Sequence, residues 1–220
     1  MMAGFDKTFE IGEYFRANPS FTSRHDTEFT GIDVEISFID SHHDVMDAEE
    51  ALLAYVINGV KAQFNDEYKK YFGGDIISLD YKIPRISLSD VYKILKDEMN
   101  YEVPRALKGD LDPDGEKLIC KYVKEKYGSD FVFIIDFPAK ARAFYSMKKD
   151  DEPELTKTYD LLFKGIEITS GAQREHRYEN LRKNIEENGI DPDSMSEYLD
   201  FFRDVAHHDK HYFFIAYGFY

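Results

Sequence analysis

The chain has 220 residues, and its composition of 43% hydrophobic and 15% aromatic residues excludes a disordered protein and allows one domain with a substantial core. The net charge of −15 argues against non-specific binding of nucleic acid by the whole surface, so a polyanion would have to bind in a local basic pocket. A single cysteine, Cys120, excludes a disulfide framework, and no apolar window approaches about 18 residues, so we expect a soluble cytoplasmic protein with no membrane partner.

Two strands are predicted near the start of the chain. Residues 9–17 (FEIGEYFRA) form the first, which ends at the turn signal NPS (18–20), and residues 30–40 (TGIDVEISFID) alternate strictly. The apolar residues of this run share one face: Ile32, Val34, Ile36 and Phe38. The small and polar residues share the other: Gly31, Asp33, Glu35 and Ser37. We therefore expect an antiparallel pair with one buried and one polar face, joined by a loop that carries Arg24 and His25.

From residue 44 the apolar period changes to that of a helix. Residues 44–64 are predicted to be helical, with Asp44 or Asp47 available as the cap. The apolar residues expected near one face are Val45, Ala48, Leu52, Tyr55, Val56 and Val60.

Helices and strands are then predicted to alternate to the end of the pattern. Residues 87–99 form a helix under a Ser or Asp cap, and residues 114–128 form another that stops at Gly128. The continuous apolar run 131–137 predicts a strand buried on both faces. Further strands are expected at 143–147, 158–164 and 165–171, and amphipathic helices at 179–189 and 192–203. The pattern predicts a single α+β domain with a mainly antiparallel sheet flanked by helices.

Cations, carboxylates and a hydroxyl gather in two of these regions. The first region offers Arg16, Arg24, His25, Glu28, Asp33 and Glu35. The second offers Asp160, Glu167, Ser170, Gln173 and Arg174. Such a set suits a phosphate site with Mg²⁺, because hard oxygen ligands bind the metal and guanidinium groups neutralise phosphate oxygens. It equally fits cross-strand ion pairs on a solvated sheet face, and no glycine-rich phosphate loop decides between the two.

The histidines and the cysteine are given structural interpretations. The pairs at 42–43 and 207–208 lack the spaced partners of zinc sites, so we interpret them as surface positions. Cys120 lies among apolar helix positions and is expected in the core.

Two long motifs resemble those of one enzyme family. FRANPSFTSRHDTEFTGIDVE (15–35) resembles motif 2 of class II aminoacyl-tRNA synthetases, in the version found in aspartyl-tRNA synthetases of the archaeal type and their bacterial relatives. YDLLFKGIEITSGAQREHRY (159–178) resembles the amino-acid and Mg²⁺ site of the same enzymes, and the similarity runs to about residue 203. The resemblance implies the class II catalytic fold, ATP and Mg²⁺ as cofactors, and formation of aspartyl-adenylate followed by transfer to tRNA.

The resemblance implies roles in ATP binding for the first motif. Arg16 matches the arginine that holds the α-phosphate, and Arg24 and His25 match the pair that reaches the β- and γ-phosphates. Phe29 matches the ring that stacks on adenine, and Glu28 the carboxylate beside it.

In the second motif the resemblance implies a metal site and an amino-acid site. Asp160, Glu167 and Ser170 match ligands of Mg²⁺ and ATP. Arg174 matches the residue that binds the side-chain carboxylate of aspartate, with Gln173 and Ser170 also at the substrate.

Two details of the second motif refine this expectation. Glu167 and Ser170 have opposite parity on a strand, so we expect Gly171 to mark a bend that lets both reach the site. The wording SGAQREH favours aspartate over asparagine, because an arginine fork pairs better with a carboxylate than with an amide.

The sequence also departs from the family pattern. The anticodon-binding barrel, motif 1, the segment with the pocket lysine and the motif 3 arginine are absent, and residues 204–220 diverge in a way that suggests a frameshift. We therefore expect a partial catalytic domain with a divergent tail, severely impaired or absent catalysis by this chain alone, and a homodimer weakened by the absence of motif 1.

Three functions remain open from the sequence. The first is the catalytic core of an aspartate–tRNA ligase acting on tRNA(Asp), with tRNA(Asn) as an alternative acceptor. The others are a tRNA-independent, asparagine synthetase-like enzyme that activates aspartate, and a non-catalytic binding fragment.

Overall fold

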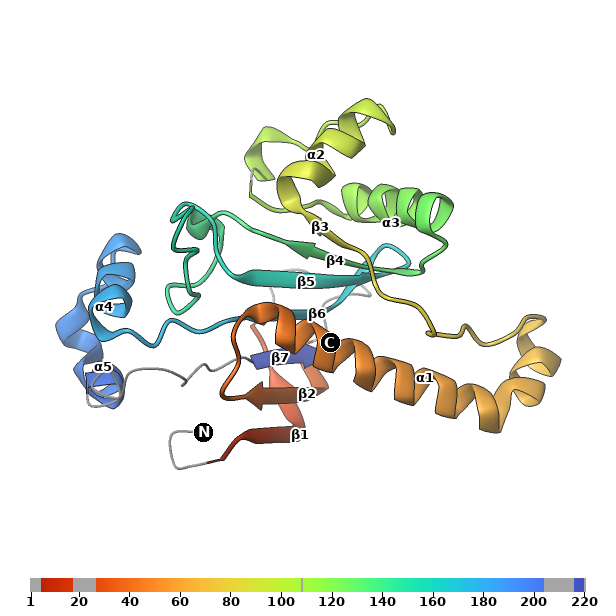
Figure 1. Cartoon of the computed structure of the whole chain (residues 1–220), viewed down its shortest axis with the longest axis horizontal. Coiled ribbons are helices and arrows are strands. Elements are labelled where there is room, and N and C mark those ends of the chain that lie inside the picture. The colour runs from red at the N-terminus through yellow and green to blue at the C-terminus, as the bar shows by residue number, and fades with distance from the viewer. Residues whose placement is uncertain (1–4, 18–26, 108, 204–215, 220) are drawn as a thin grey trace.

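The computed structural model describes residues 5–17, 27–107, 109–203 and 216–219, and these contain a seven-stranded sheet of order β1-β2-β7-β6-β5-β4-β3 (Figure 1). The strands are β1 Lys7–Phe15, β2 Glu28–Ile36, β3 Arg85–Ser87, β4 Phe131–Ile135, β5 Thr158–Phe163, β6 Ile166–Ala172 and β7 Ala216–Phe219. Each described neighbour pair is antiparallel except β3 and β4, which are parallel. The predicted α+β fold with a mainly antiparallel sheet is confirmed.

Helices cover parts of both faces of the sheet. They are α1 His42–Phe72, α2 Leu88–Asp97, α3 Pro113–Tyr127, α4 Tyr178–Glu187 and α5 Ser196–Arg203, with short 3₁₀ turns at η1 Arg105–Leu107, η2 Ala139–Ala141 and η3 Pro192–Met195. Helix α1 crosses one face, α2 and α3 pack near β3 and β4, and α4 and α5 form a separate pair beyond the ends of the central strands (Figure 1). None of the described helices has the length and apolarity needed to cross a membrane.

Strand β4 shows how the core is divided. Phe131 and Phe133 pack into the cluster beneath α1, whereas Val132 and Ile134 pack into the cluster beneath α2 and α3. Because successive side chains of a strand point to opposite faces, a strand covered on both sides is apolar throughout. The prediction of a doubly buried strand is confirmed.

The caps of the two middle helices also agree with the sequence. The side chain of Ser87 accepts a hydrogen bond from the backbone N–H of Asp90 at the start of α2 (3.2 Å). Gly128 ends α3 with a φ of 72°, a conformation that favours glycine.

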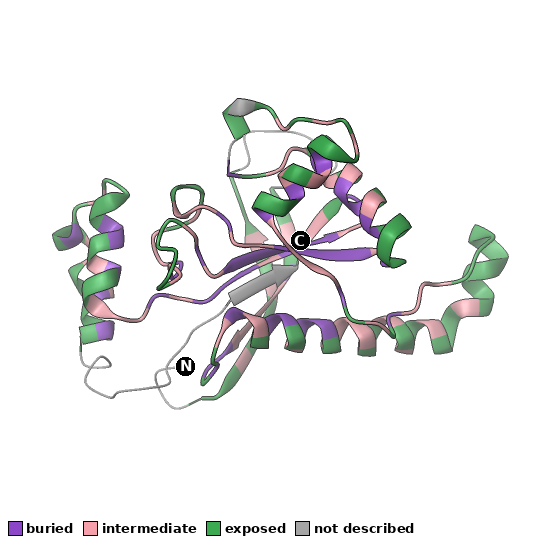
Figure 2. Ribbon diagram, turned by 45° about the horizontal axis from the view of Figure 1, so that its top comes forward, coloured by how far each residue is buried: buried purple, intermediate pink, exposed green. Residues whose placement is uncertain are grey.

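Helix α1 differs from the prediction. Ser41, and not an aspartate, is the N-cap, with Asp44 completing a capping box. The buried residues of α1 all lie between His42 and Glu50, so the second half of the helix extends past the sheet (Figure 2). Tyr55 on the expected apolar face is 82% exposed, so that part of the prediction is wrong. The surface interpretation is also wrong for His42, which is 5% exposed.

Two local predictions fail for reasons of backbone geometry. Phe38 follows the end of β2 with a φ of 59°, which turns its side chain to solvent instead of the core. Residues 143–147 form a turn with isolated bridges, Ser146 to Arg174 and Lys148 to Thr156, and not a strand.

Candidate active site

One face of the sheet collects the polar residues of both motifs. Asp160 on β5 pairs with Ser170 on β6. Ser170 pairs in turn with Gly218 on β7, and Gly218 pairs on its other side with Asp33 on β2. Because directly paired residues of neighbouring strands lie on the same face, these three side chains form a row across the sheet. The row lies opposite the face that α1 covers.

A β-bulge in β6 brings Glu167 to the same face. Leu161 pairs with Thr169, but the next residue, Leu162, pairs with Glu167, so Ile168 is the extra residue of the bulge. Leu162 has the same parity as the aspartate of the row, and its partner therefore faces the same way. The expected bend at Gly171 is thus replaced by a bulge three residues earlier.

Gly171 has a different role, which is to allow close packing. A Cβ atom at this position would lie 2.3 Å from Cζ of Tyr159. Tyr159 is fully buried on the face that α1 covers, so its ring occupies the space that a side chain at 171 would need.

One carboxylate oxygen of Asp160 is hydrogen-bonded, and the other has no hydrogen-bond partner among the described residues. Its Oδ2 accepts a hydrogen bond from Nη2 of Arg142 (2.5 Å), and the guanidinium carbon of Arg142 lies 3.6 Å from the ring centroid of Phe137. Oδ1 of Asp160 is buried and has no hydrogen-bond partner among the described residues. An unsatisfied buried carboxylate oxygen is costly, and a bound cation would remove that cost.

The pKa shifts of Asp160 and Glu167 agree with a cation site. Burial raises the pKa of Asp160, although Arg142 opposes the rise. Burial and the neighbouring Asp160 raise the pKa of Glu167 to about 8. Two carboxyl groups that cannot both ionise easily would do so once a divalent cation lies between them.

The oxygen ligands on this face fit Mg²⁺, which also binds substrate phosphates, better than a metal ion that the protein alone would have to hold. Asp160, Glu167 and Ser170 supply two carboxylates and a hydroxyl on one face. Within the described part of the chain, no group of three or more His, Cys, Asp and Glu side chains could hold a metal ion. Mg²⁺ is usually bound by one or two carboxylates together with substrate phosphates, so this set is sufficient only with a phosphate ligand.

At the other end of the row, aromatic and basic side chains of the first motif form a platform. The hydroxyl of Tyr14 donates to Oδ2 of Asp33 (2.6 Å), and this bond raises the pKa of Tyr14 to about 12. The Tyr14 ring stacks on Phe29, with centroids 5.9 Å apart, and lies over Gly31, where a Cβ would come within 2.7 Å of the ring. The guanidinium carbon of Arg16 is 5.4 Å from the Phe29 centroid.

Arg174 is the third part of the candidate site. Its guanidinium carbon is 4.1 Å from the ring centroid of Tyr145. Burial raises the pKa of Glu35, and the positive charge of Arg174 opposes that rise. Burial also raises the pKa of Tyr198 on α5, again against Arg174. The guanidinium therefore stacks on Tyr145, and its charge acts on Glu35 and Tyr198.

Some predicted site residues are not brought to this face. Gln173 is fully buried, and neither atom of its side-chain amide has a described hydrogen-bond partner. Glu28 is exposed at the start of β2 and has the opposite strand parity to Phe29. Arg24 and His25 lie outside the described residues.

The sequence patterns missed several residues of the site. Arg142 pairs with a carboxylate 18 positions later, and no local pattern indicates such a contact. Tyr145 falls in the segment mistaken for a strand. Tyr14 could have been found, because it shares strand parity with Arg16.

Comparisons with known proteins show the family to which the chain belongs. The sequence family described as tRNA synthetases class II (D, K and N) matches residues 1–209. The aspartate–tRNA(Asp/Asn) ligase of Aeropyrum pernix is 41% identical over 207 residues, which are 94% of this chain and 46% of that protein. The aspartate–tRNA(Asp) ligase of Pyrococcus abyssi is 42% identical over 199 residues, 90% of this chain and 44% of that protein.

Solved structures show the same likeness. The aspartyl-tRNA synthetase of Entamoeba histolytica superposes with a TM-score of 0.87 at 31% identity, covering 99% of this chain and 44% of that one. The asparaginyl-tRNA synthetase of Pyrococcus horikoshii, solved with asparaginyl-adenylate, gives 0.83 at 26% identity over 99% of this chain and 48% of that one. The chain thus spans less than half the length of these relatives. With the family match over most of its length, the chain belongs to the class II tRNA synthetases of the D, K and N type.

Proposed function

We propose that this chain forms the core of an aspartate–tRNA ligase site, which activates aspartate with ATP before transfer to tRNA. The observation that supports it most is the bulge in β6, which puts Glu167 on the same face as Ser170, Asp160 and Asp33. Relatives more than 40% identical carry the name aspartate–tRNA ligase. A solvated face of ion pairs would not require a buried carboxylate oxygen without a partner, so that alternative is less well supported.

In this proposal the first motif binds ATP. Arg16 holds the α-phosphate, Phe29 stacks on adenine, and Arg24 and His25 reach the outer phosphates. Attack by a carboxylate on the α-phosphate brings negative charges together, and fixed cations stabilise that charge without reorganising. Mg²⁺ held by Asp160, Glu167 and Ser170 would neutralise phosphate oxygens.

Arg174 selects the amino acid in this proposal. Its guanidinium is held against Tyr145 and near Glu35, and a planar fork binds a carboxylate in two hydrogen bonds. An amide offers one acceptor and one donor group, so asparagine would form a poorer pair. The placement of Glu28 and Gln173 supports no contact with either substrate, and they have no role in the proposal.

The relatives suggest the other partners. Their names give tRNA(Asp) or tRNA(Asp/Asn) as the acceptor, and we propose tRNA(Asp) here, with charging of a tRNA(Asn) transcript as the measurement that checks for a second acceptor. We also propose that the protein is cytoplasmic. We propose that it forms a homodimer, and sedimentation would measure this oligomeric state.

Aspartate-dependent exchange between ATP and pyrophosphate tests the proposal directly. Exchange should require aspartate, should not occur with asparagine, and should vanish in Arg174→Ala. Arg182→Ala is the matched control, because Arg182 forms exposed ion pairs with Glu186 and Asp193 on the outside of α4. Exchange that persists in Arg174→Ala, or an absence of exchange from the folded chain, would contradict the proposal. Ammonia-dependent formation of asparagine would instead identify the tRNA-independent alternative.

A further inference from the structure

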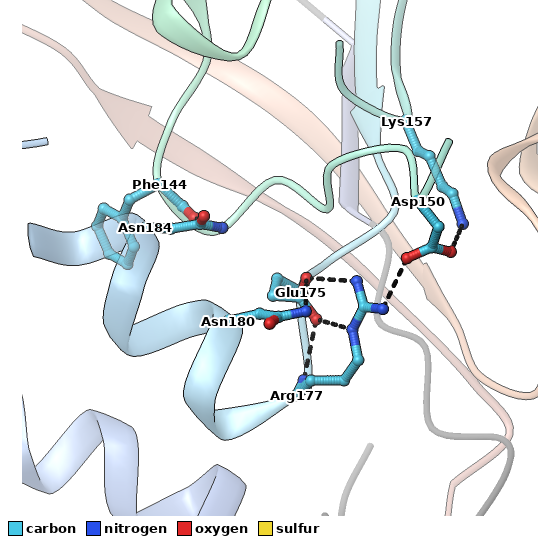
Figure 3. Close-up of polar contacts among 7 residues, drawn as sticks. All are labelled: Phe144, Asp150, Lys157, Glu175, Arg177, Asn180 and Asn184. Atoms are coloured by element: carbon cyan, nitrogen blue, oxygen red, sulfur yellow. Dashed lines mark hydrogen bonds and ion pairs between the residues drawn. The ribbon is translucent and has the colours of Figure 1, made fainter. Parts of the chain in front are cut away.

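Glu175 and Arg177, which follow Arg174 in the chain, form a series of alternating charges with Asp150 and Lys157 (Figure 3). Glu175 is 1% exposed, and its carboxylate accepts hydrogen bonds from Nε and Nη2 of Arg177, both 2.8 Å. The backbone N–H of Arg177 donates to the same carboxylate (3.0 Å). Nη1 of Arg177 donates to Asp150 (2.8 Å), and the other oxygen of Asp150 lies 3.9 Å from Nζ of Lys157.

Arg177 and Asp150 are charged at neutral pH. The bonds to Glu175 raise the pKa of Arg177 above its usual range, and the bond to Arg177 lowers the pKa of Asp150. The side-chain amide of Asn180 on α4 also contacts this cluster. A buried carboxylate is tolerated when it is paired and hydrogen-bonded in this way, whereas removing one partner leaves an uncompensated charge.

The backbone around Arg174 is held on both sides. Met147 donates its N–H to the carbonyl of Gln173 (2.8 Å), and Glu175 donates its N–H to the carbonyl of Tyr145 (2.8 Å). Tyr145 also supplies the ring beneath the Arg174 guanidinium. Adjacent side chains of an extended segment point to opposite sides, so a Glu175 fixed inward directs its neighbour towards the open face.

Fixing that direction matters because, among the described residues, the contact shown for the guanidinium is its stacking on Tyr145. A guanidinium that stacks on a ring can slide along it, so the Tyr145 ring does not fix its direction. The Glu35 carboxylate attracts the Arg174 guanidinium, but it also competes with a substrate carboxylate for the same positive charge. The Glu175–Arg177 fork, by contrast, is bidentate and directional.

We propose that Glu175 and Arg177 are positioning residues, whose fork sets the direction of Arg174 and thereby the affinity of the site for an amino acid with a side-chain carboxylate. The inference rests on the proposed function, in which Arg174 binds that carboxylate. A fork with a merely structural role would change the stability of the fold but would not single out one substrate.

The experiment compares Michaelis constants for aspartate and ATP in the pyrophosphate exchange reaction of the full chain. Glu175→Gln keeps the shape and removes the charge, and it should raise KM for aspartate by about 10- to 100-fold, the scale of a misplaced catalytic or binding group. KM for ATP should remain unchanged. Glu187→Gln is the matched control: it breaks the Lys148–Glu187 pair at the far end of α4, and both constants should match the unmodified chain.

Arg177→Lys keeps the charge but loses the fork, so it should give the same selective rise and decides the question if Glu175→Gln does not fold. An aspartate KM equal to that of the unmodified chain, or equal rises for aspartate and ATP, would overturn the positioning role. Exchange without aspartate dependence in the unmodified chain would overturn the proposed function and this inference together. If aspartate dependence disappears in Arg174→Ala but is unaffected in both fork variants, the positioning role alone is overturned.

Discussion

Replacing Gly171 by alanine would put a methyl group into the ring of Tyr159. The new Cβ would lie 2.3 Å from Cζ and 2.5 Å from both Cε1 and the hydroxyl oxygen. Tyr159 cannot easily move, because it is fully buried and packs edge-on against Phe133 with ring centroids 5.4 Å apart. The strand or the ring must therefore shift within a closely packed core.

Such overpacking costs about 1–3 kcal/mol, and we expect Gly171→Ala to lie near the upper end, about 3 kcal/mol. For a chain of this size that corresponds to a fall in Tm of about 6–12 °C. Gly12→Ala on β1 is the matched control, because its Cβ would meet only the flexible Glu10 carboxylate, at 3.4 Å. Alanine there should be neutral or stabilising by up to about 1 kcal/mol, since it restricts the unfolded chain.

Urea unfolding followed by circular dichroism measures both variants. The double variant Gly171→Ala/Tyr159→Leu should lose less stability than the sum of its single variants, because the shorter side chain makes room for the methyl group. A free energy of unfolding for Gly171→Ala within about 0.5 kcal/mol of the unmodified chain would refute the close-packing explanation, since surface-like changes fall in that range.

Three further predictions concern stability and reactivity. Burial raises the pKa of Glu49 from 4.5 to about 7, so its protonated form stabilises the fold below about pH 4.5 and that contribution is lost as the pH rises to 7. Glu49→Gln should remove this loss of about 3 kcal/mol, which urea unfolding at pH 5 and pH 8 would detect; an unchanged pH slope would contradict it. Ser87→Ala should lower the free energy of unfolding by about 1 kcal/mol through the lost cap of α2, whereas an unchanged urea midpoint would show that the cap contributes nothing. The Cys120 thiol, whose pKa burial raises to about 11, should react with a disulfide reagent at pH 8 only after unfolding, and rapid reaction in the folded chain would place it at the surface.

Sequence patterns predicted those parts of the fold that depend on local periodicity. The apolar run of β4 and the cap residues Ser87 and Gly128 are examples, because each follows from the chemistry of a few adjacent residues. The periodicity of α1 predicted a helix but not where its packing stops, since that depends on the width of the sheet beneath it. Beyond Glu50, Leu53, Ala54 and Ile57 are only partly buried against the core, whereas Tyr55, Val56 and Val60 are exposed.

The candidate site shows the same division. The charged residues were found from their types and from the resemblance of two motifs to a known family, but the bulge at Ile168 depends on pairing with β5 and has no local signal. Arg142 was missed as a site residue because its partner, Asp160, is 18 positions away and is brought near only by tertiary packing. Gln173 was assigned to the substrate by its place in a motif, and the sequence did not indicate that the fold buries it completely.

The central claim is that one face of the sheet binds ATP and aspartate together. Calorimetric titration with a non-hydrolysable analogue of aspartyl-adenylate tests it most directly, because the analogue carries both halves of the intermediate. We expect one site per chain, with affinity reduced about 10-fold or more in Arg16→Ala and in Arg174→Ala, since a charge-assisted hydrogen bond contributes about 1.5–3 kcal/mol. Arg182→Ala should bind as the unmodified chain does. Failure of the folded chain to bind the analogue, or equal binding by all variants, would contradict the account.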